Sequence, residues 1–198
     1  MSNHIEDLKA IRQIMEKSSK FLSLSGKSGI AIGITALVAS LYVYNATGHF
    51  SLAESQGPSQ DIELLLIALL TLVVSLSLGL VFTFNKTKTR KEKLWTKQSK
   101  KLLVNLAVPL LIGAIACGAF IYHETIWPIS SLTLIFYGVA LVNGANYTYK
   151  DIYFLGLIEI SLGLLSLFFI EYALLFWGLG FGIMHILYGA IMYTKYEK

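Results

Sequence analysis

Residues 62–84 read IELLLIALLTLVVSLSLGLVFTF, and residues 86–101, which follow almost directly, read KTKTRKEKLWTKQSKK. The first stretch carries one charged residue, Glu63, and as a helix it is long enough to cross about 30 Å of hydrocarbon. The second stretch holds eight basic residues against one acid. Short basic loops stay on the cytoplasmic side and orient the spans beside them. The two stretches together predict a transmembrane helix that ends at the cytoplasmic face of a membrane.

The same pattern of apolar runs and basic loops predicts five further spans. The six expected spans lie at about 25–44, 62–84, 102–122, 129–147, 152–170 and 173–193. Along this path all sixteen Lys and Arg residues fall on one side of the membrane. We therefore expect an all-α, polytopic membrane helical bundle of six transmembrane helices in three hairpins over residues 25–198. Both termini should lie in the cytoplasm, and the expected location is the cytoplasmic (inner) membrane.

The composition argues against a water-soluble bundle. The chain is 55% hydrophobic and 14% charged, whereas charged residues make up about a quarter of an average soluble chain. A soluble helix needs a polar face, yet residues 102–122 carry no charge. The sole cysteine, Cys117, lies in an apolar run, so a disulfide framework within one chain is excluded.

Residues 1–24 precede the first predicted span and have helical periodicity. Ile5, Leu8, Ile11 and Met15 recur every three or four residues among charges of both signs. We expect a short amphipathic helix on the cytoplasmic side, lying along the lipid headgroups. Docking of this helix on another chain is the alternative.

The basic loop is expected to contact anionic lipid headgroups, each basic residue near the surface contributing about 1 kcal/mol. Nucleic-acid binding is the alternative use of such a run, but a position between two spans favours lipid, so no nucleic-acid partner is expected. The predicted lipid-surface residues are Lys86, Lys88, Arg90, Lys91, Lys93, Lys97, Lys100 and Lys101.

Glycines recur at helical spacing in the first and the last two spans. Small residues let transmembrane helices approach closely, as in the GxxxG step formed by Gly29 and Gly33. The predicted helix-packing residues are Gly29, Gly33, Gly156, Gly163, Gly178, Gly182 and Gly189. Their partners are helices of the same chain, of a homo-oligomer or of another membrane protein.

Two ionisable residues lie inside the last two spans. Glu159 and His185 are each thirteen positions from Tyr172, where the last hairpin is expected to turn, so they should stand level. Each shares a helical face with glycines, which directs both side chains into protein. A structural tie between helices is one interpretation of this intramembrane polar pair, and a proton-handling site is the other. Tyr137 also lies in mid-span, away from the headgroup levels that tyrosines prefer.

A second set of polar residues could form a layer nearer the cytoplasm, or each could simply bond to a neighbouring helix. These residues are Asn105, Asn143, Ser75 and Ser77. The four histidines match no zinc-binding spacing, so we expect neither a metal nor a cofactor. A surface metal site made by His49, His123 and Glu124 is the alternative.

Two stretches near the N-terminus, IRQIMEKS at 11–18 and FLSLSGKSGI at 21–30, resemble a group of small multispan bacterial integral membrane proteins of unassigned function. The likeness covers chiefly the first forty residues, besides length and span count. It implies a cytoplasmic-membrane setting and a short helix leading into a glycine-rich first span. It implies no catalytic or binding residues.

Two functional hypotheses follow from the sequence. The favoured one is a non-enzymatic membrane subunit that works by helix packing, as a homo-oligomer or beside an unknown partner, and it rests on the glycine faces. The second is a small proton-coupled transporter or channel that uses Glu159 and His185. No reaction is nominated by any motif, so an enzyme is not expected.

Overall fold

A computed structural model describes residues 24–51, 57–91 and 94–198, and in these ranges all regular structure is helical. The predicted amphipathic helix of the N-terminus falls outside the described residues. The α-helices are α2 (Gly26–Thr47), α3 (Pro58–Thr89), α4 (Lys97–Tyr122), α5 (Ile129–Gly144), α6 (Asp151–Phe168), α7 (Ala173–Trp177) and α8 (His185–Tyr196). A 3₁₀ turn η1 (Ala145–Tyr147) follows α5, another, η2 (Ile170–Tyr172), precedes α7, and a π-helix η3 (Gly178–Met184) joins α7 to α8.

Six helical stretches are long and apolar enough to cross a membrane, as the sequence predicts. They are Gly26–Thr47, Pro58–Thr89, Lys97–Tyr122, Ile129–Tyr147, Asp151–Phe168 and Ile170–Tyr196. Each overlaps one predicted span. The sixth is not a uniform α-helix, because it contains η2, α7, η3 and α8 in succession.

Local signals make α3 and α4 begin earlier than the apolar runs within them. Pro58 occupies the first turn of α3, where a missing N–H costs nothing. Thr96 and Ser99 form a capping box at the start of α4: Ser99 N donates to Thr96 Oγ1 at 3.0 Å, and Thr96 N donates to Ser99 Oγ at 2.8 Å. Helices thus extend beyond the hydrocarbon-length runs, because backbone hydrogen bonding continues into the polar region.

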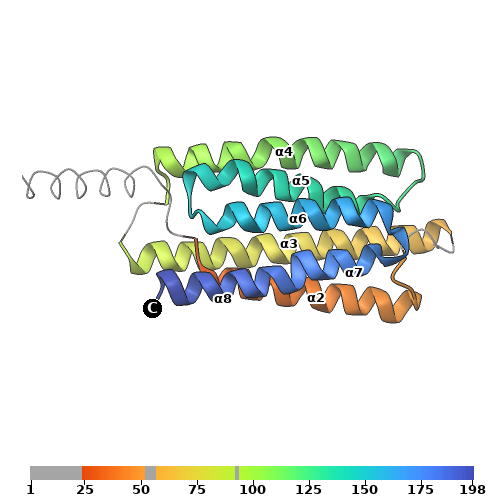
Figure 1. Cartoon of the computed structure of the whole chain (residues 1–198), viewed down its shortest axis with the longest axis horizontal. Coiled ribbons are helices and arrows are strands. Elements are labelled where there is room, and N and C mark those ends of the chain that lie inside the picture. The colour runs from red at the N-terminus through yellow and green to blue at the C-terminus, as the bar shows by residue number, and fades with distance from the viewer. Residues whose placement is uncertain (1–23, 52–56, 92–93) are drawn as a thin grey trace, which may run out of the picture.

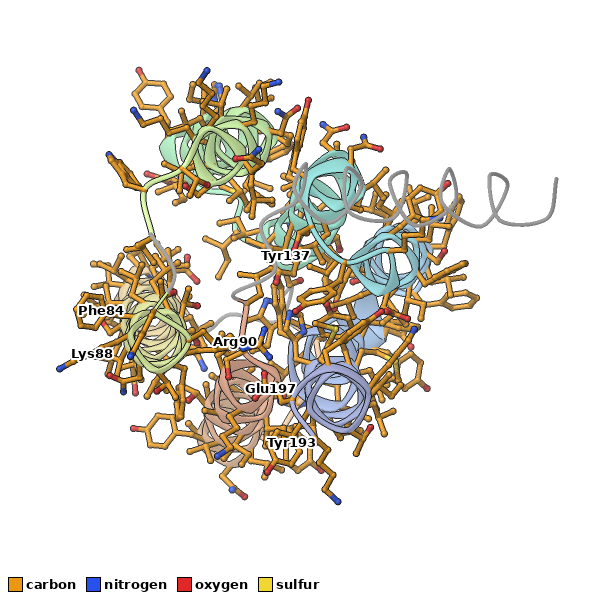
Figure 2. All side chains as sticks on the ribbon, turned by 90° about the vertical axis from the view of Figure 1, so that its left-hand side faces the viewer. Phe84, Lys88, Arg90, Tyr137, Tyr193 and Glu197 are labelled. Carbon is orange, nitrogen blue, oxygen red and sulfur yellow. The ribbon has the colours of Figure 1, made fainter. Side chains whose placement is uncertain are left out.

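The helices run side by side along one axis (Figure 1). We call the end that holds Lys86, Arg90 and the C-terminus the basic end, and the end with the α4–α5 and α6–α7 turns the opposite end. Seen from the basic end, the order around the bundle is α3, α2, α8, α6, α5, α4 (Figure 2). Among the described residues α3 and α4 do not pack extensively on each other, so the ring of helices is open between them.

Packing is densest along α5, α6 and the last span. The most extensive pair is α5 with α6, which belong to different predicted hairpins, so the packing does not divide into three separate hairpins. By contrast α3 and α4 carry large exposed side chains, such as Leu80 at 70% and Ile115 at 73% exposure. Exposed apolar residues on these helices suit contact with lipid tails.

Glycine allows α2 to touch the last span through the backbone. A Cβ on Gly189 would lie 2.6 Å from both Gly26 O and Ile30 N, and one on Gly33 would lie 2.6 Å from Gly182 O. Such distances leave no room for any side chain. The predicted packing glycines of the first and last spans therefore meet each other within one chain.

The pair α5–α6 uses the same device. A Cβ on Gly156 would lie 2.7 Å from Gly138 O, and one on Gly163 would lie 2.9 Å from Ser131 O. Beside the second contact, Ser131 Oγ donates to Ser166 Oγ at 2.8 Å, and both hydroxyls are buried. Close approach of the backbones and one hydrogen bond between two buried hydroxyls hold these two helices together.

We expect Gly189→Ala to lower the thermal stability of the protein in detergent, because the added methyl group must push α2 away from α8. Overpacking of this kind costs about 1–3 kcal/mol. Gly118→Ala is the matched control, since nothing lies within 4 Å of a Cβ built there. Gly118→Ala should leave the free energy of unfolding unchanged or raise it by about 0.5–1 kcal/mol, because alanine loses less backbone entropy than glycine when a helix forms. Equal effects of the two substitutions on the unfolding temperature would contradict the glycine contact.

Candidate functional site

Three polar side chains meet in the interior of the bundle. Glu159 comes from the middle of α6, His185 begins α8, and Tyr137 comes from α5. His185 Nδ1 lies 3.3 Å from Glu159 Oε1, and His185 Nε2 lies 2.8 Å from Tyr137 Oη. The structure thus brings together the two residues that counting from Tyr172 places at one level. It adds a phenol that the sequence marks only as a tyrosine in mid-span.

The carboxyl group of Glu159 is completely buried, and neither oxygen has a hydrogen-bond partner in the described part of the chain. Its space is provided by Gly180, where any Cβ would clash with Glu159 Oε2 and would lie 2.6 Å from Leu134 Cδ2. A buried polar group without hydrogen bonds is costly, and a buried charge more so. Stability alone therefore does not account for an acid at this position.

The contacts of His185 determine which groups each ring nitrogen can bond to. Nδ1 lies 3.0 Å from the carbonyl oxygen of Gly180 and 3.3 Å from Glu159 Oε1, so a hydrogen on Nδ1 can be donated to either oxygen. Nε2 can accept the hydroxyl hydrogen of Tyr137 when the hydrogen of the neutral ring is on Nδ1, or donate to the Tyr137 oxygen when Nε2 carries a hydrogen. The phenol can serve either state without moving.

The π-helix η3 sets the direction of these groups. Within it Gly178 and Gly182 pack toward α2, whereas Gly180 packs on Glu159. The spacing of Gly178, Gly182 and His185 predicts that they share one helical face, and this is wrong: the two glycines face α2, while His185 faces α5 and α6. A π-helix has a wider turn than an α-helix, so it shifts the faces of the residues around it, and such turns occur often at functional sites.

Aromatic rings cover the site on the side of η3. The ring of Phe181 stacks on His185 with centroids 5.8 Å apart and lies 5.1 Å from the ring of Tyr137. Trp177 in turn lies 5.1 Å from Phe181. His185 itself is only 3% exposed. The imidazole is therefore held in one orientation by rings on one side and hydrogen bonds at both nitrogens.

This arrangement can hold one exchangeable proton in two ways. In one state Glu159 is a neutral acid beside Nδ1, and His185 is neutral with its hydrogen on Nε2, from which it donates to Tyr137. In the other the carboxylate lies beside a charged imidazole that donates to Gly180 O at Nδ1 and to Tyr137 at Nε2. The overall charge is the same in both states, so either is tolerated in a region of low dielectric constant.

The predicted polar layer is not formed. Asn105 Nδ2 donates to Lys101 O within α4, and Ser77 Oγ donates to Val73 O within α3. Asn143 and Ser77 are exposed, and Ser75 lies on α3, away from α5. Asn105 and Ser77 bond within their own helices, Asn143 faces outward, and α3 does not pack on α5, so the four residues do not gather.

Most of the predicted lipid-surface residues are exposed at the basic end. Exposed are Lys88, Arg90, Lys91, Lys97, Lys100 and Lys101, whereas Lys93 lies outside the described residues. Lys86 differs, because its side chain is only 9% exposed and points into the protein. The prediction of a lipid contact is wrong for this residue.

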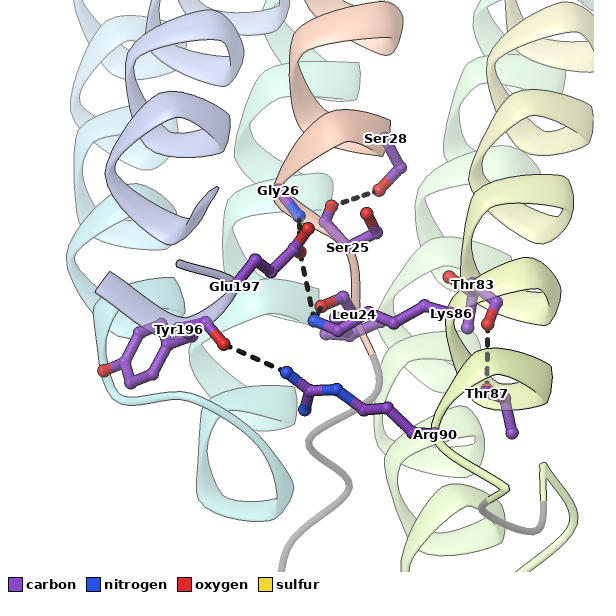
Figure 3. A network of polar contacts seen from close by, with 10 residues as sticks. All are labelled: Leu24, Ser25, Gly26, Ser28, Thr83, Lys86, Thr87, Arg90, Tyr196 and Glu197. Atoms are coloured by element: carbon purple, nitrogen blue, oxygen red, sulfur yellow. Dashed lines mark hydrogen bonds and ion pairs between the residues drawn. The ribbon is translucent and has the colours of Figure 1, made fainter. Parts of the chain in front are cut away.

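Lys86 belongs to a network that sequence patterns do not reveal (Figure 3). Its Nζ lies 3.0 Å from Glu197 Oε1 and also donates to the carbonyl oxygen of Leu24. The same carboxylate oxygen accepts from Gly26 N at 2.6 Å, at the first residue of α2. One carboxylate next to the C-terminus therefore joins the start of α2 to the end of α3.

Arg90, the C-cap residue of α3, adds a second link between α3 and the end of α8. Its Nη2 donates to the carbonyl oxygen of Tyr196 at 3.0 Å. Burial by itself raises the pKa of Glu197, but hydrogen bonds from the Gly26 N–H and from Lys86 outweigh it and hold that pKa below its ordinary value. Glu197 is thus an anion in the folded protein at neutral pH.

In the described residues no three His, Cys, Asp or Glu side chains are placed to hold a metal ion, so the alternative site of His49, His123 and Glu124 is not formed. Comparison of the chain with protein-family models, with curated proteins and with solved structures found no match. The resemblance to small multispan bacterial proteins stays a prediction.

We expect the thermal stability of the detergent-solubilised protein to fall in acid partly through Glu197. Its pKa is lower in the folded than in the unfolded chain, so its contribution is complete above the unfolded value, about 4.3. That contribution is lost as the pH falls through the lower, folded value. Unfolding temperatures measured between about pH 7 and about pH 3 should depend less on pH in Glu197→Gln.

Glu171→Gln is the control for this measurement, because Glu171 is exposed at the opposite end. It should leave the pH dependence of the unfolding temperature as it is in the wild type. If Glu197→Gln also leaves it unchanged, the carboxylate does not hold α2 and α3 in the way described.

Proposed function

We propose that the protein is a small proton-coupled transporter or channel of the cytoplasmic membrane, in which Glu159 and His185 take up and release a proton. The observation that supports this most is the state of Glu159: a fully buried acid, without hydrogen bonds of its own, next to an imidazole bonded at both nitrogens. Ionisable groups inside transmembrane segments commonly mark ion or proton pathways.

A purely structural role explains the pair less well. The chain already contains a structural tie to α6, the Ser131–Ser166 hydroxyl bond from α5, and it uses no ionisable group. Glu159 offers four acceptor positions and uses none of them in a hydrogen bond with described residues. A tie between helices requires no ionisable group, whereas proton exchange does.

The proposed orientation follows the basic residues. The exposed lysines and Arg90 at the basic end favour the cytoplasmic side for that end, and with it for both termini, because basic segments resist translocation. On that side they would meet anionic lipid headgroups.

The competing function, a non-enzymatic subunit that assembles by helix packing, has lost its main argument. The glycine faces on which it rested are filled by helices of the same chain. Assembly with a second copy or another membrane protein would have to use exposed side chains such as those of α3 and α4, which lipid can cover equally well.

We expect vesicles that contain the purified protein and a pH-sensitive dye to change their internal pH when a pH gradient or a membrane potential is imposed. Glu159→Gln should reduce this flux to the level of protein-free vesicles, because an amide cannot release the proton. Glutamine has nearly the same volume, so the fold should be kept, and an unfolding curve in detergent checks this.

Glu171→Gln again serves as the matched control and should keep the wild-type flux. Infrared difference spectra provide a second measurement: the C=O band of a protonated carboxyl should be present in the wild type and reduced in Glu159→Gln. No wild-type flux under either driving force, or equal flux in Glu159→Gln, contradicts the proposal.

A further inference from the structure

The polar site is followed by one further polar group in the direction of the basic end. Leu141 is four residues after Tyr137, Leu155 is four residues before Glu159, and Tyr188 is three residues after His185. At about 1.5 Å rise per residue, all three lie roughly one turn nearer the basic end. They also meet there, because Tyr188 packs on the buried cluster that contains Leu141 and Leu155.

The hydroxyl of Tyr188 is buried and has no hydrogen-bond partner among the described residues. The cluster around it is otherwise apolar: Leu141, Ala145, Ile152 and Leu155. Phenylalanine would fill the same volume without leaving a polar group unpaired. Packing therefore accounts for the ring of Tyr188 but not for its hydroxyl. In the same way, packing does not account for the carboxyl group of Glu159.

A second acid, Asp151, lies at the basic end of α6, on the same face of this helix as Glu159. Asp151, Leu155 and Glu159 are spaced by four along α6, and Tyr188, Met192 and Tyr196 are spaced by four along α8. Asp151 accepts from Tyr196 Oη at 2.6 Å and from Lys195 Nζ at 2.9 Å, and its side chain is partly exposed. This cluster can exchange protons with water directly.

One apolar layer separates Tyr188 from that cluster. It contains Met192, which is 1% exposed. Methionine is unbranched and has three rotatable bonds, so it can change its conformation in place more easily than a branched side chain. The ring of Tyr149, which lies 4.2 Å from that of Tyr196, also borders this end.

The opposite direction is closed more tightly. Leu134, one turn from Tyr137, is completely buried and lies against Glu159 at Gly180. Beyond it the hydroxyls of Ser131 and Ser166 are bonded to each other. A further buried hydroxyl without a partner among the described residues, that of Ser130, is level with this serine pair. Ala173 and Leu174, at the start of α7, are also buried.

We infer that Glu159 exchanges its proton with the basic end of the protein, through the hydroxyl of Tyr188 and with Asp151 at the mouth, while the opposite side is closed. This inference rests on the proposed function and adds two details to it: the residue that relays the proton, Tyr188, and the end of the protein at which the proton enters and leaves.

The transfer conserves atoms and charge. Tyr188 receives a proton from the side of Asp151 and gives its own hydroxyl hydrogen to Tyr137 Oη. Tyr137 gives its hydrogen to His185 Nε2, and His185 gives its Nδ1 hydrogen to Glu159 Oε1. Each tyrosine keeps one hydrogen, His185 changes tautomer, and one proton has moved to Glu159. The reverse sequence releases it to the same side.

The test is the rate at which the Glu159 carboxyl exchanges hydrogen for deuterium, followed by its infrared C=O band after transfer of the reconstituted protein into D₂O. Tyr188→Phe keeps the ring and removes the hydroxyl, so the band should remain while its exchange slows at least about tenfold, a loss typical for removal of one proton-transfer group. Asp151→Asn should slow the exchange as well, which provides a second variant.

Tyr193→Phe is the matched control. Tyr193 is on the same helix, but its ring faces Lys27 of α2 and it lies near the rim of the bundle (Figure 2), so the exchange rate should stay at the wild-type value. Wild-type exchange with an unchanged rate in both Tyr188→Phe and Asp151→Asn overturns the route and leaves the proposed function standing. If the wild type shows no C=O band of Glu159, or a band that does not exchange, both the route and the proposed function are overturned.

Discussion

Contact between helix backbones at glycine is the constraint on which the rest of this structure depends. Without side chains at Gly26, Gly33 and Gly189, α2 and the last span touch directly, and their relative height cannot slide by a turn without clashes. Gly138 and Gly156 fix α5 against α6 in the same way. These two rigid pairs, α2 with the last span and α5 with α6, then determine where His185 on the last span meets Glu159 on α6.

The position of Glu159 shows how this rigidity is used. A buried acid with unpaired oxygens lowers the stability of the fold, so the surrounding helices must tolerate it. They do so through the backbone contacts and through the Ser131–Ser166 bond, none of which involves the acid. Scaffold and site are thus separate sets of residues, although both draw on α5, α6 and the last span, and substitutions in the site can change the chemistry while the packing is retained.

The sequence predicted the six spans because length and hydrophobicity depend on the bilayer alone. It also predicted that Glu159 and His185 stand level, since counting from a turn needs no knowledge of packing. It did not predict the π-helix, which rotates His185 away from the glycine face, because that change arises from tertiary contacts. Tyr137 and the Lys86–Glu197 pair were missed for a related reason: their partners are 48 and 111 residues away in sequence, and no local pattern marks such a pairing.

The tie at the basic end has a consequence for the order of assembly. Glu197 directly follows the sixth span, yet it accepts from the first N–H of α2 and from Lys86 near the end of α3. Chains are synthesised from the N-terminus, so the first two spans enter the bilayer well before the residue that fastens them exists. Glu197 can therefore join α2 to α3 only after the four later spans have been synthesised.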